Sequence, residues 1–381
     1  MSGTSDITPI PLEIQENQHI YYEYFDFDFS KALADEVLEL LEKDYFRSVL
    51  VGFDEKIVRN NPDAPIIFAG NHSGMAFPWD GIIFSSMHLK KNNYQLQYTA
   101  RPLSAPMLSK STLMNPFLIP NLWKRVGCVD ATFRNFETMM YYPDSHVFLY
   151  PEGVPGIGKG YNNKYKLQRM SSSFIYMSIK FKTDIIPVYT VNGENINPQT
   201  YSLTWLNNLS QKVGVPFVPV GFLTPLLLLQ PWLFYFSFPA KLTYVRGSRI
   251  KAYEFTDQAA ESISKEQLRA YADEVRNQMQ AELDAAVEKY GKQPYSVKEH
   301  LRIIFQNLKL FPYTVPNGWP LLFAEFEHFW KRKKAGKPAK MRLGWFSTFR
   351  IILQNPIVLC YFIPIVGWIP LLIKGYRNNK I

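Results

Sequence analysis

The sequence predicts an α/β fold, in which a mixed, partly parallel sheet is flanked by helices and followed by a helical, basic tail. Two observations lead to this prediction. Short apolar runs bounded by turn residues alternate with stretches of helical periodicity, and Lys and Arg are concentrated towards the C-terminus. The 381 residues suffice for one large domain with extensions.

The order of the elements follows from these patterns. Leu33, Val37 and Leu41 recur at helical spacing, which predicts a first helix at residues 31–50. Buried strands are expected at 66–70, 96–100, 146–150, 185–191 and 241–245, and helices at 171–182 and 265–289. We divide the chain into an N-terminal lead-in and helix (1–44), a main domain (45–290) and a C-terminal extension (291–381).

Two uncharged segments lie outside this alternation. Residues 213–240 contain five prolines, which argue against a continuous spanning helix, so this segment is either an apolar surface for a lipid chain or a buried connection. Residues 356–373 are just long enough to span a bilayer, but Pro364 and Pro370 interrupt them and positive charges flank both sides. We therefore expect an interfacial or re-entrant anchor there.

The charge distribution limits the classes of binding partner that we expect. Residues 301–381 contain thirteen Lys or Arg and only two acidic residues, Glu325 and Glu327. The net charge of this tail is therefore more positive than the +9 of the whole chain. Anionic membrane and nucleic acid are the alternatives; aromatic residues among the charges favour membrane lipids, and no nucleic-acid recognition module is found. With only two cysteines, and without the pattern of a signal peptide at the start of the sequence, we expect the protein at the cytoplasmic face of the membrane.

The most informative motif begins directly after the strand at 66–70 and reads Asn-His-Ser-Gly, with His72 in second place and Asp80 following. Catalytic residues often follow such strands in α/β proteins. A neutral histidine can take a proton from an alcohol, and a nearby carboxylate can hold its ring in one tautomer. No Gly-x-Ser-x-Gly elbow is present, so a serine nucleophile of that kind is not expected.

Four ordered blocks resemble the glycerolipid and lysophospholipid acyltransferase family. They are the His-Asp block at 71–81, the stretch 127–134, the Pro-Glu-Gly of 151–153 and the Ile-Ile-Pro-Val of 185–188. The resemblance covers about a third of the chain. The sequence is similar to the 1-acylglycerol-3-phosphate acyltransferases. It resembles most a branch with a long His-Asp spacing, because seven residues separate His72 from Asp80.

The resemblance implies roles for individual residues. His72 would be the general base and Asp80 would orient it. Glu152, Gly153, Arg134 and Lys159 would bind the acceptor, and no metal or cofactor would be needed. Three of these roles have alternatives. Glu152 could simply cap the turn with Gly153, and Lys159 could belong to a solvated basic turn. Arg134 could form a surface salt bridge, and the usual Thr-Arg after Pro-Glu-Gly is replaced by Val154-Pro155.

The expected function is that of a membrane-associated O-acyltransferase, with the acyltransferase domain at 45–290. It would transfer a fatty acyl group from acyl-CoA or acyl carrier protein to a hydroxyl of a lysophospholipid or other glycerolipid. Because a thioester is already activated, the reaction needs a base but no protein nucleophile. A lipid hydrolase using the same histidine and a catalytically silent lipid-binding protein are the alternatives.

Overall fold

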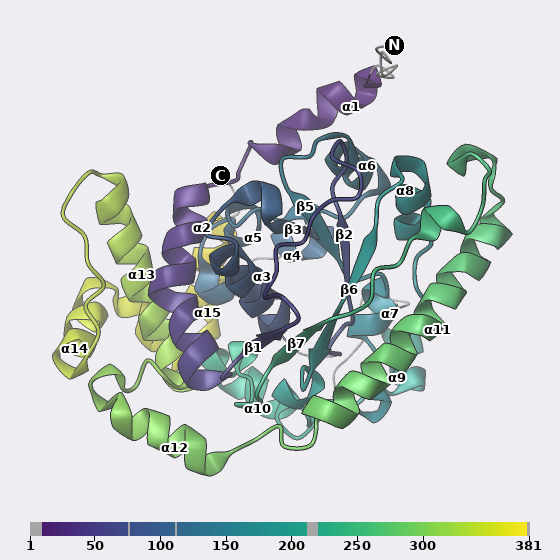
Figure 1. The fold of residues 1–381 in the computed structure, drawn as a ribbon. Coiled ribbons are helices and arrows are strands. Elements are labelled where there is room, and N and C mark those ends of the chain that lie inside the picture. Colours follow the sequence, from purple (N-terminus) through teal and green to yellow (C-terminus); the bar gives the residue numbers. More distant parts are fainter. Residues whose placement is uncertain (1–9, 75–76, 111–112, 212–219, 379–381) are drawn as a thin grey trace.

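The computed structural model describes residues 10–74, 77–110, 113–211 and 220–378. These residues form a seven-stranded sheet with the strand order β1-β7-β6-β2-β5-β3-β4 (Figure 1). The β6 and β7 strands are antiparallel, whereas the other neighbouring strands are parallel. The predicted α/β class with a mixed, mostly parallel sheet flanked by helices is confirmed.

The strands are β1 (Val49–Val51), β2 (Ile67–Gly70), β3 (Ala100–Ser104), β4 (Val129–Asp130), β5 (His146–Leu149), β6 (Ile185–Val191) and β7 (Thr243–Arg246). The strands predicted at 66–70, 146–150, 185–191 and 241–245 are confirmed to within two residues. The strand predicted at 96–100 is wrong. Leu96–Tyr98 forms a short 3-10 turn without a buried side chain, and the strand starts only at Ala100.

The α-helices are α1 (Leu12–Asn17), α2 (Phe27–Leu33), α3 (Trp79–Lys91), α4 (Pro106–Lys110), α5 (Leu122–Arg125), α6 (Phe133–Tyr141), α7 (Gly153–Ile157), α8 (Ser173–Phe181), α9 (Thr204–Gln211), α10 (Thr224–Leu229), α11 (Lys265–Tyr290), α12 (Val297–Gln306), α13 (Trp319–Lys334), α14 (Trp345–Gln354) and α15 (Trp368–Asn378). The first helix starts earlier than predicted because Asp26 caps it, accepting a hydrogen bond from Phe29 N at 3.0 Å. It continues through π-helical turns to Tyr45, and the end of the predicted helix is strand β1.

Two hydrophobic cores lie on opposite faces of the sheet. In β2 and the residue before it, Ile66 and Phe68 belong to one core, whereas Ile67 and Ala69 belong to the other. This alternation follows from the two-residue period of a strand. The first core receives α2, α3 and α13, and the second receives α6, α8 and α11 (Figure 1). Apolar side chains cover both faces, which explains why the central strands read as continuous apolar runs.

Helix α13 is part of the first core, although it lies in the basic tail. Trp319 is fully buried, and its ring centroid lies 5.0 Å from that of Trp79 at the start of α3. Farther along α13, Phe326 packs against Phe29 of α2 with 5.4 Å between ring centroids. A chain cut at about residue 307 would uncover Trp79, so the extension 291–381 cannot be removed without damaging the core of the main domain.

The two uncharged segments are broken into short pieces. The first contains α10 and the 3-10 helix Pro231–Tyr235, and its residues 213–219 lie outside the described part of the chain. The second contains the 3-10 helix Pro356–Tyr361 followed by α15. Across the described ranges, we find no helix that combines the length and the apolar character needed to cross a bilayer.

The buried position of Trp319 predicts a large loss of stability on truncation. Trp319→Ala should lower the free energy of unfolding by about 3–5 kcal/mol, because it removes a large aromatic side chain and leaves a cavity. Trp205→Ala is the matched control, since Trp205 on α9 is 66% exposed. Urea denaturation measures both. Equal effects of the two substitutions would contradict the placement of α13 in the core.

Candidate functional site

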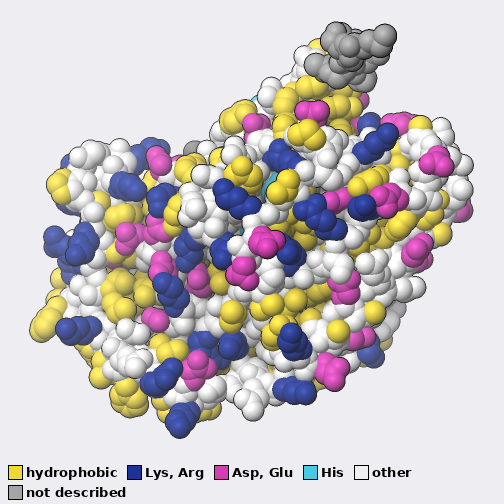
Figure 2. Space-filling model, viewed as in Figure 1, with side chains coloured by type: hydrophobic (Ala, Val, Ile, Leu, Met, Phe, Trp, Pro, Cys, Tyr) yellow, Lys and Arg dark blue, Asp and Glu magenta, His cyan; other side chains and the backbone are white. Residues whose placement is uncertain are grey.

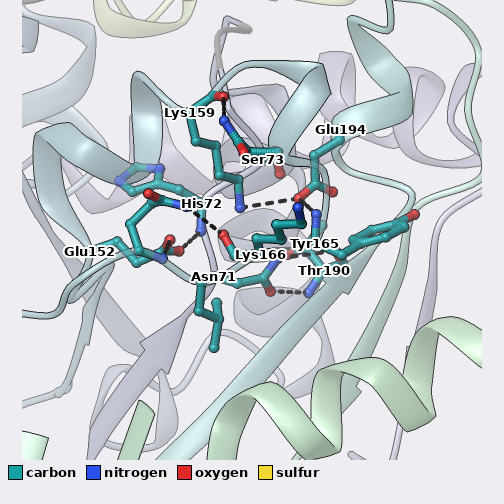
Figure 3. Close-up of polar contacts among 12 residues, drawn as sticks. Asn71, His72, Ser73, Glu152, Lys159, Tyr165, Lys166, Thr190 and Glu194 are labelled. Atoms are coloured by element: carbon teal, nitrogen blue, oxygen red, sulfur yellow. Dashed lines mark hydrogen bonds and ion pairs between the residues drawn. The ribbon is translucent and has the colours of Figure 1, made fainter. Parts of the chain in front are cut away.

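The candidate site lies where three neighbouring strands end. β2 lies between β5 and β6 and is parallel to both, so the carboxyl ends of the three strands meet at one edge of the sheet. His72 follows β2, Glu152 follows β5 and Glu194 follows β6. Figure 3 shows these three residues grouped around Lys159. Such an edge is where α/β proteins usually hold their ligands.

Asn71 fixes the chain just before His72. Its side-chain oxygen accepts a hydrogen bond from Thr190 N at 2.7 Å, and its amide nitrogen donates to Thr190 O at 3.4 Å (Figure 3). The Asn71 side chain thus continues the pairing of β2 with β6 beyond the last residue of β2. Because Asn71 is completely buried, this pair also satisfies polar groups that water cannot reach.

Glu152 holds the backbone around His72. One carboxylate oxygen accepts a hydrogen bond from His72 N at 2.8 Å, and the other accepts one from Gln168 N at 2.7 Å. Burial raises the pKa of Glu152, while Lys159 and the two amides oppose the rise. The structure therefore gives Glu152 a positioning contact with His72. A direct role in binding the acceptor, which the sequence suggested, has no support in this geometry because both oxygens face backbone amides.

The His72 ring is half-buried and stacks on Tyr150. The two ring centroids are 4.2 Å apart and the planes are inclined by 21°. Gly156 of α7 packs closely against the same histidine. A methyl group at position 156 would lie 2.9 Å from two carbons of His72 and 2.6 Å from Glu152 Cβ, so only glycine fits without a shift. Within the described residues, no hydrogen bond of either ring nitrogen is found.

The surroundings keep His72 neutral. Burial lowers its pKa to about 3, and the positive charge of Lys159 acts in the same direction. A neutral imidazole has one nitrogen lone pair that can accept a proton. The ring is therefore in the protonation state of a general base across the physiological range, although a low pKa also makes it a weak one.

Asp80 is not the partner of His72 in this structure. It lies in the first turn of α3, is buried, and accepts a hydrogen bond from Ser73 Oγ. The Tyr244 hydroxyl donates to its backbone oxygen at 2.7 Å. In the described part of the chain, no hydrogen bond or ion pair joins Asp80 to the His72 ring. The predicted dyad geometry is thus wrong for this conformation, because the loop closes with Ser73 facing the carboxylate. Burial raises the pKa of Asp80, and the bond from Ser73 opposes the rise.

Lys159 and Glu194 form a buried ion pair beside His72. Lys159 Nζ lies 3.2 Å from Glu194 Oε1, and both side chains are at most 1% exposed (Figure 3). The same carboxylate oxygen accepts a hydrogen bond from Tyr165 N at 3.1 Å. Lys159 is therefore not part of a solvated basic turn. Its charge lies beneath the site, where it stabilises the buried carboxylates.

Three residues of the site were not predicted from the sequence: Glu194, Ser73 and Tyr150. Glu194 could have been found, because it follows the predicted strand 185–191 at the same sheet edge as His72. Tyr150 ends the predicted strand 146–150 at the same edge, but its stacking on the His72 ring and the contact of Ser73 with Asp80 depend on the fold of the chain around them.

The remaining predicted residues have other positions. Gly153 starts α7 with a φ of +56°, a conformation that favours glycine, and a methyl group there would meet no atom within 4 Å. Arg134 is exposed on α6 and donates a hydrogen bond to Glu13 O at 2.8 Å. The structure therefore ties Arg134 to the N-terminal helix and gives it no contact with the His72 site. Among the described residues, no cluster of three potential metal ligands is found.

The lowered pKa of His72 predicts a pH dependence of stability. Between pH 6.5 and about 3 the unfolded chain binds a proton at this histidine and the folded chain does not, so its contribution makes stability fall as the pH falls. The contribution of His72 to the free energy of unfolding changes by at most about 1.4 kcal/mol per pH unit. The change is smaller because the ring is partly exposed to solvent. His72→Gln should flatten the fall in unfolding free energy between pH 7 and pH 5. An unchanged fall would mean that His72 titrates alike in both states.

Comparison with known proteins gives relatives without an assigned activity. No family model matches the chain. An uncharacterized protein of Mycobacterium tuberculosis and one of Mycobacterium bovis are each 26% identical to it over 266 residues, and an uncharacterized protein of Mycobacterium leprae is 26% identical over 255 residues. Each match covers 63% of this chain and 65–66% of the relative. The chain is therefore similar to these mycobacterial proteins over about two thirds of its own length.

Proposed function

We propose that this protein is a membrane-associated O-acyltransferase. It transfers a fatty acyl group from acyl-CoA or acyl carrier protein to a hydroxyl of a lysophospholipid or another glycerolipid. The observation that carries the proposal is the state of His72, which is neutral, half-buried and without a protein partner at its ring nitrogens among the described residues. Around it, Glu152, Gly156 and Tyr150 hold the ring at the carboxyl edge of the sheet.

The reaction follows from one base and one activated donor. A ring nitrogen of His72 takes the proton of the acceptor hydroxyl as the oxygen attacks the thioester carbonyl. The C–O bond forms, the C–S bond breaks, and His72 returns the proton to the departing thiolate. Neither oxidant nor metal is required for this balance. Glu152 acts as a positioning residue through the backbone of His72.

The acceptor is less constrained than the base. The arginine that the family pattern places after Pro-Glu-Gly is missing, Arg134 is engaged with Glu13, and Lys159 is buried against Glu194. A phosphate on the acceptor would therefore need a cation from elsewhere or a movement of Lys159. This arrangement makes a neutral glycerolipid acceptor as compatible with the site as a lysophospholipid.

One observation favours a different function. The His72 ring has no carboxylate partner among the described residues, and such a partner would hold the tautomer and stabilise the imidazolium. A catalytically silent lipid-binding protein would have no need of that contact. A lipid hydrolase would use the same His72 to activate water, and only the products separate it from the acyltransferase.

The proposal is tested with purified protein, labelled acyl-CoA and a panel of lipid acceptors. We expect acceptor-dependent transfer, and His72→Gln should lower turnover by about 10²-fold or more because it removes the base. His19→Gln is the matched control, since His19 is an exposed residue of the N-terminal segment. Release of free fatty acid in place of an acylated lipid would identify a hydrolase. Equal transfer by the wild type and His72→Gln would reject the assigned base.

A further inference from the structure

We propose that α12, α14 and the start of α15 with the loop before it form one docking face for an anionic lipid bilayer. This inference rests on the proposed function, because a lipid acceptor is reached at a membrane surface, and it names the part of the molecule that makes the contact. The sequence predicts membrane binding by the tail 301–381 as a whole with an interfacial anchor at 356–373, whereas this face leaves out α13 and includes only the part of 356–373 around Ile365.

Helix α14 supplies the most exposed apolar side chains of this face. Trp345, Phe346, Phe349 and Leu353 are 63%, 97%, 67% and 67% exposed. Their spacing places them along one side of the helix. The other side is anchored, since Ile351 is buried in the core beneath it. The outward aromatic stripe therefore belongs to a helix that is held firmly by the domain.

Helix α12 continues the apolar face. Val297, Leu301 and Phe305 recur every four residues and are 73%, 46% and 67% exposed. The chain after α12 lies beside the start of α14, where the rings of Phe311 and Trp345 are 5.7 Å apart. The stripes of α12 and α14 are thus neighbouring parts of one surface.

The third part of the face is the turn into α15. Ile365, Val366 and Ile369 are 61%, 63% and 59% exposed. The segment Pro356–Tyr361, which precedes this turn, packs against both α14 and α15 and so connects the two helices. The exposed apolar side chains of this face come in groups and not as scattered single residues, and such patches mark contacts with membranes or partners.

Charge selects an anionic bilayer as the occupant. Lys298, Arg302 and Lys309 are exposed along α12 and the turn after it, and the chain from residue 328 to residue 381 contains no Asp or Glu. Figure 2 shows Lys and Arg among hydrophobic side chains along the left and lower left margin, over α14 and α12. Basic residues surrounding aromatic and aliphatic ones are typical of surfaces that lie in the headgroup region.

The test replaces the stripe on α14 and measures vesicle binding by flotation. The variant Phe346→Ser/Phe349→Ser/Leu353→Ser should bind phosphatidylcholine–phosphatidylglycerol vesicles about tenfold or more weakly than the wild type, because three apolar side chains no longer enter the lipid. The matched control is Leu12→Ser/Val58→Ser/Phe133→Ser, which removes three exposed apolar residues outside the face and should bind as the wild type does. Wild-type binding should weaken on pure phosphatidylcholine and at high salt.

Other outcomes would overturn the inference. Equal binding by the α14 variant and the control would place the docking site elsewhere. If the wild type is a dimer without lipid and the α14 variant is a monomer, the face joins two copies of the chain. Failure of the proposed function is separable, because His72→Gln should float like the wild type while it loses acyl transfer. Unchanged circular dichroism of the α14 variant shows that it has folded.

Discussion

The parallel pairing of β2 with β5 and β6 is the constraint on which the site depends. The register aligns Ala69 with Leu149 and Gly70 with Val188, so β2 and β5 finish within one residue of each other and β6 continues for three more residues. Residues that are more than forty positions apart in the chain then emerge side by side. Close packing is needed there, since a methyl group on Gly70 would lie 2.9 Å from Tyr150, the residue on which His72 stacks.

This edge holds buried charges, and their mutual arrangement decides whether it can be stable. A buried carboxylate loses its hydration, which costs free energy unless other groups replace the water. Glu152 obtains two backbone amides, Asp80 obtains Ser73, and Glu194 obtains Lys159 and one amide. His72 avoids the cost differently, because it stays neutral. The residue left with unpaired ring nitrogens among the described neighbours is also the one to which we assign the role of the base.

The sequence was most informative where burial dictates composition. Strands such as Ile185–Val191 are buried on both faces, so each is a continuous apolar run and could be predicted. The apolar run at 96–100 was wrongly predicted as a strand. It lies at the margin of the sheet, where apolar residues need not pair with a neighbouring strand. The partner of Asp80 could not be predicted, since it depends on the path of the loop between His72 and Pro78. Lys159 could be predicted as a site residue from its charge. The spacing along the sequence did not indicate that Lys159 forms a buried ion pair with Glu194.

The C-terminal helices combine two tasks that composition alone could not separate. Both α13 and α14 contain aromatic and basic residues, yet Trp319 and Phe326 of α13 are buried whereas Phe346 of α14 is almost fully exposed. The difference lies in what each helix contacts, because α13 packs against both α2 and α14, whereas α14 packs with one side only. A helix fixed by its inner side cannot reorient when its outer side meets lipid. The proposed bilayer contact and the edge that holds His72 therefore belong to one continuous core. Binding to a membrane would then set the orientation of the site relative to the bilayer without any rearrangement of the fold.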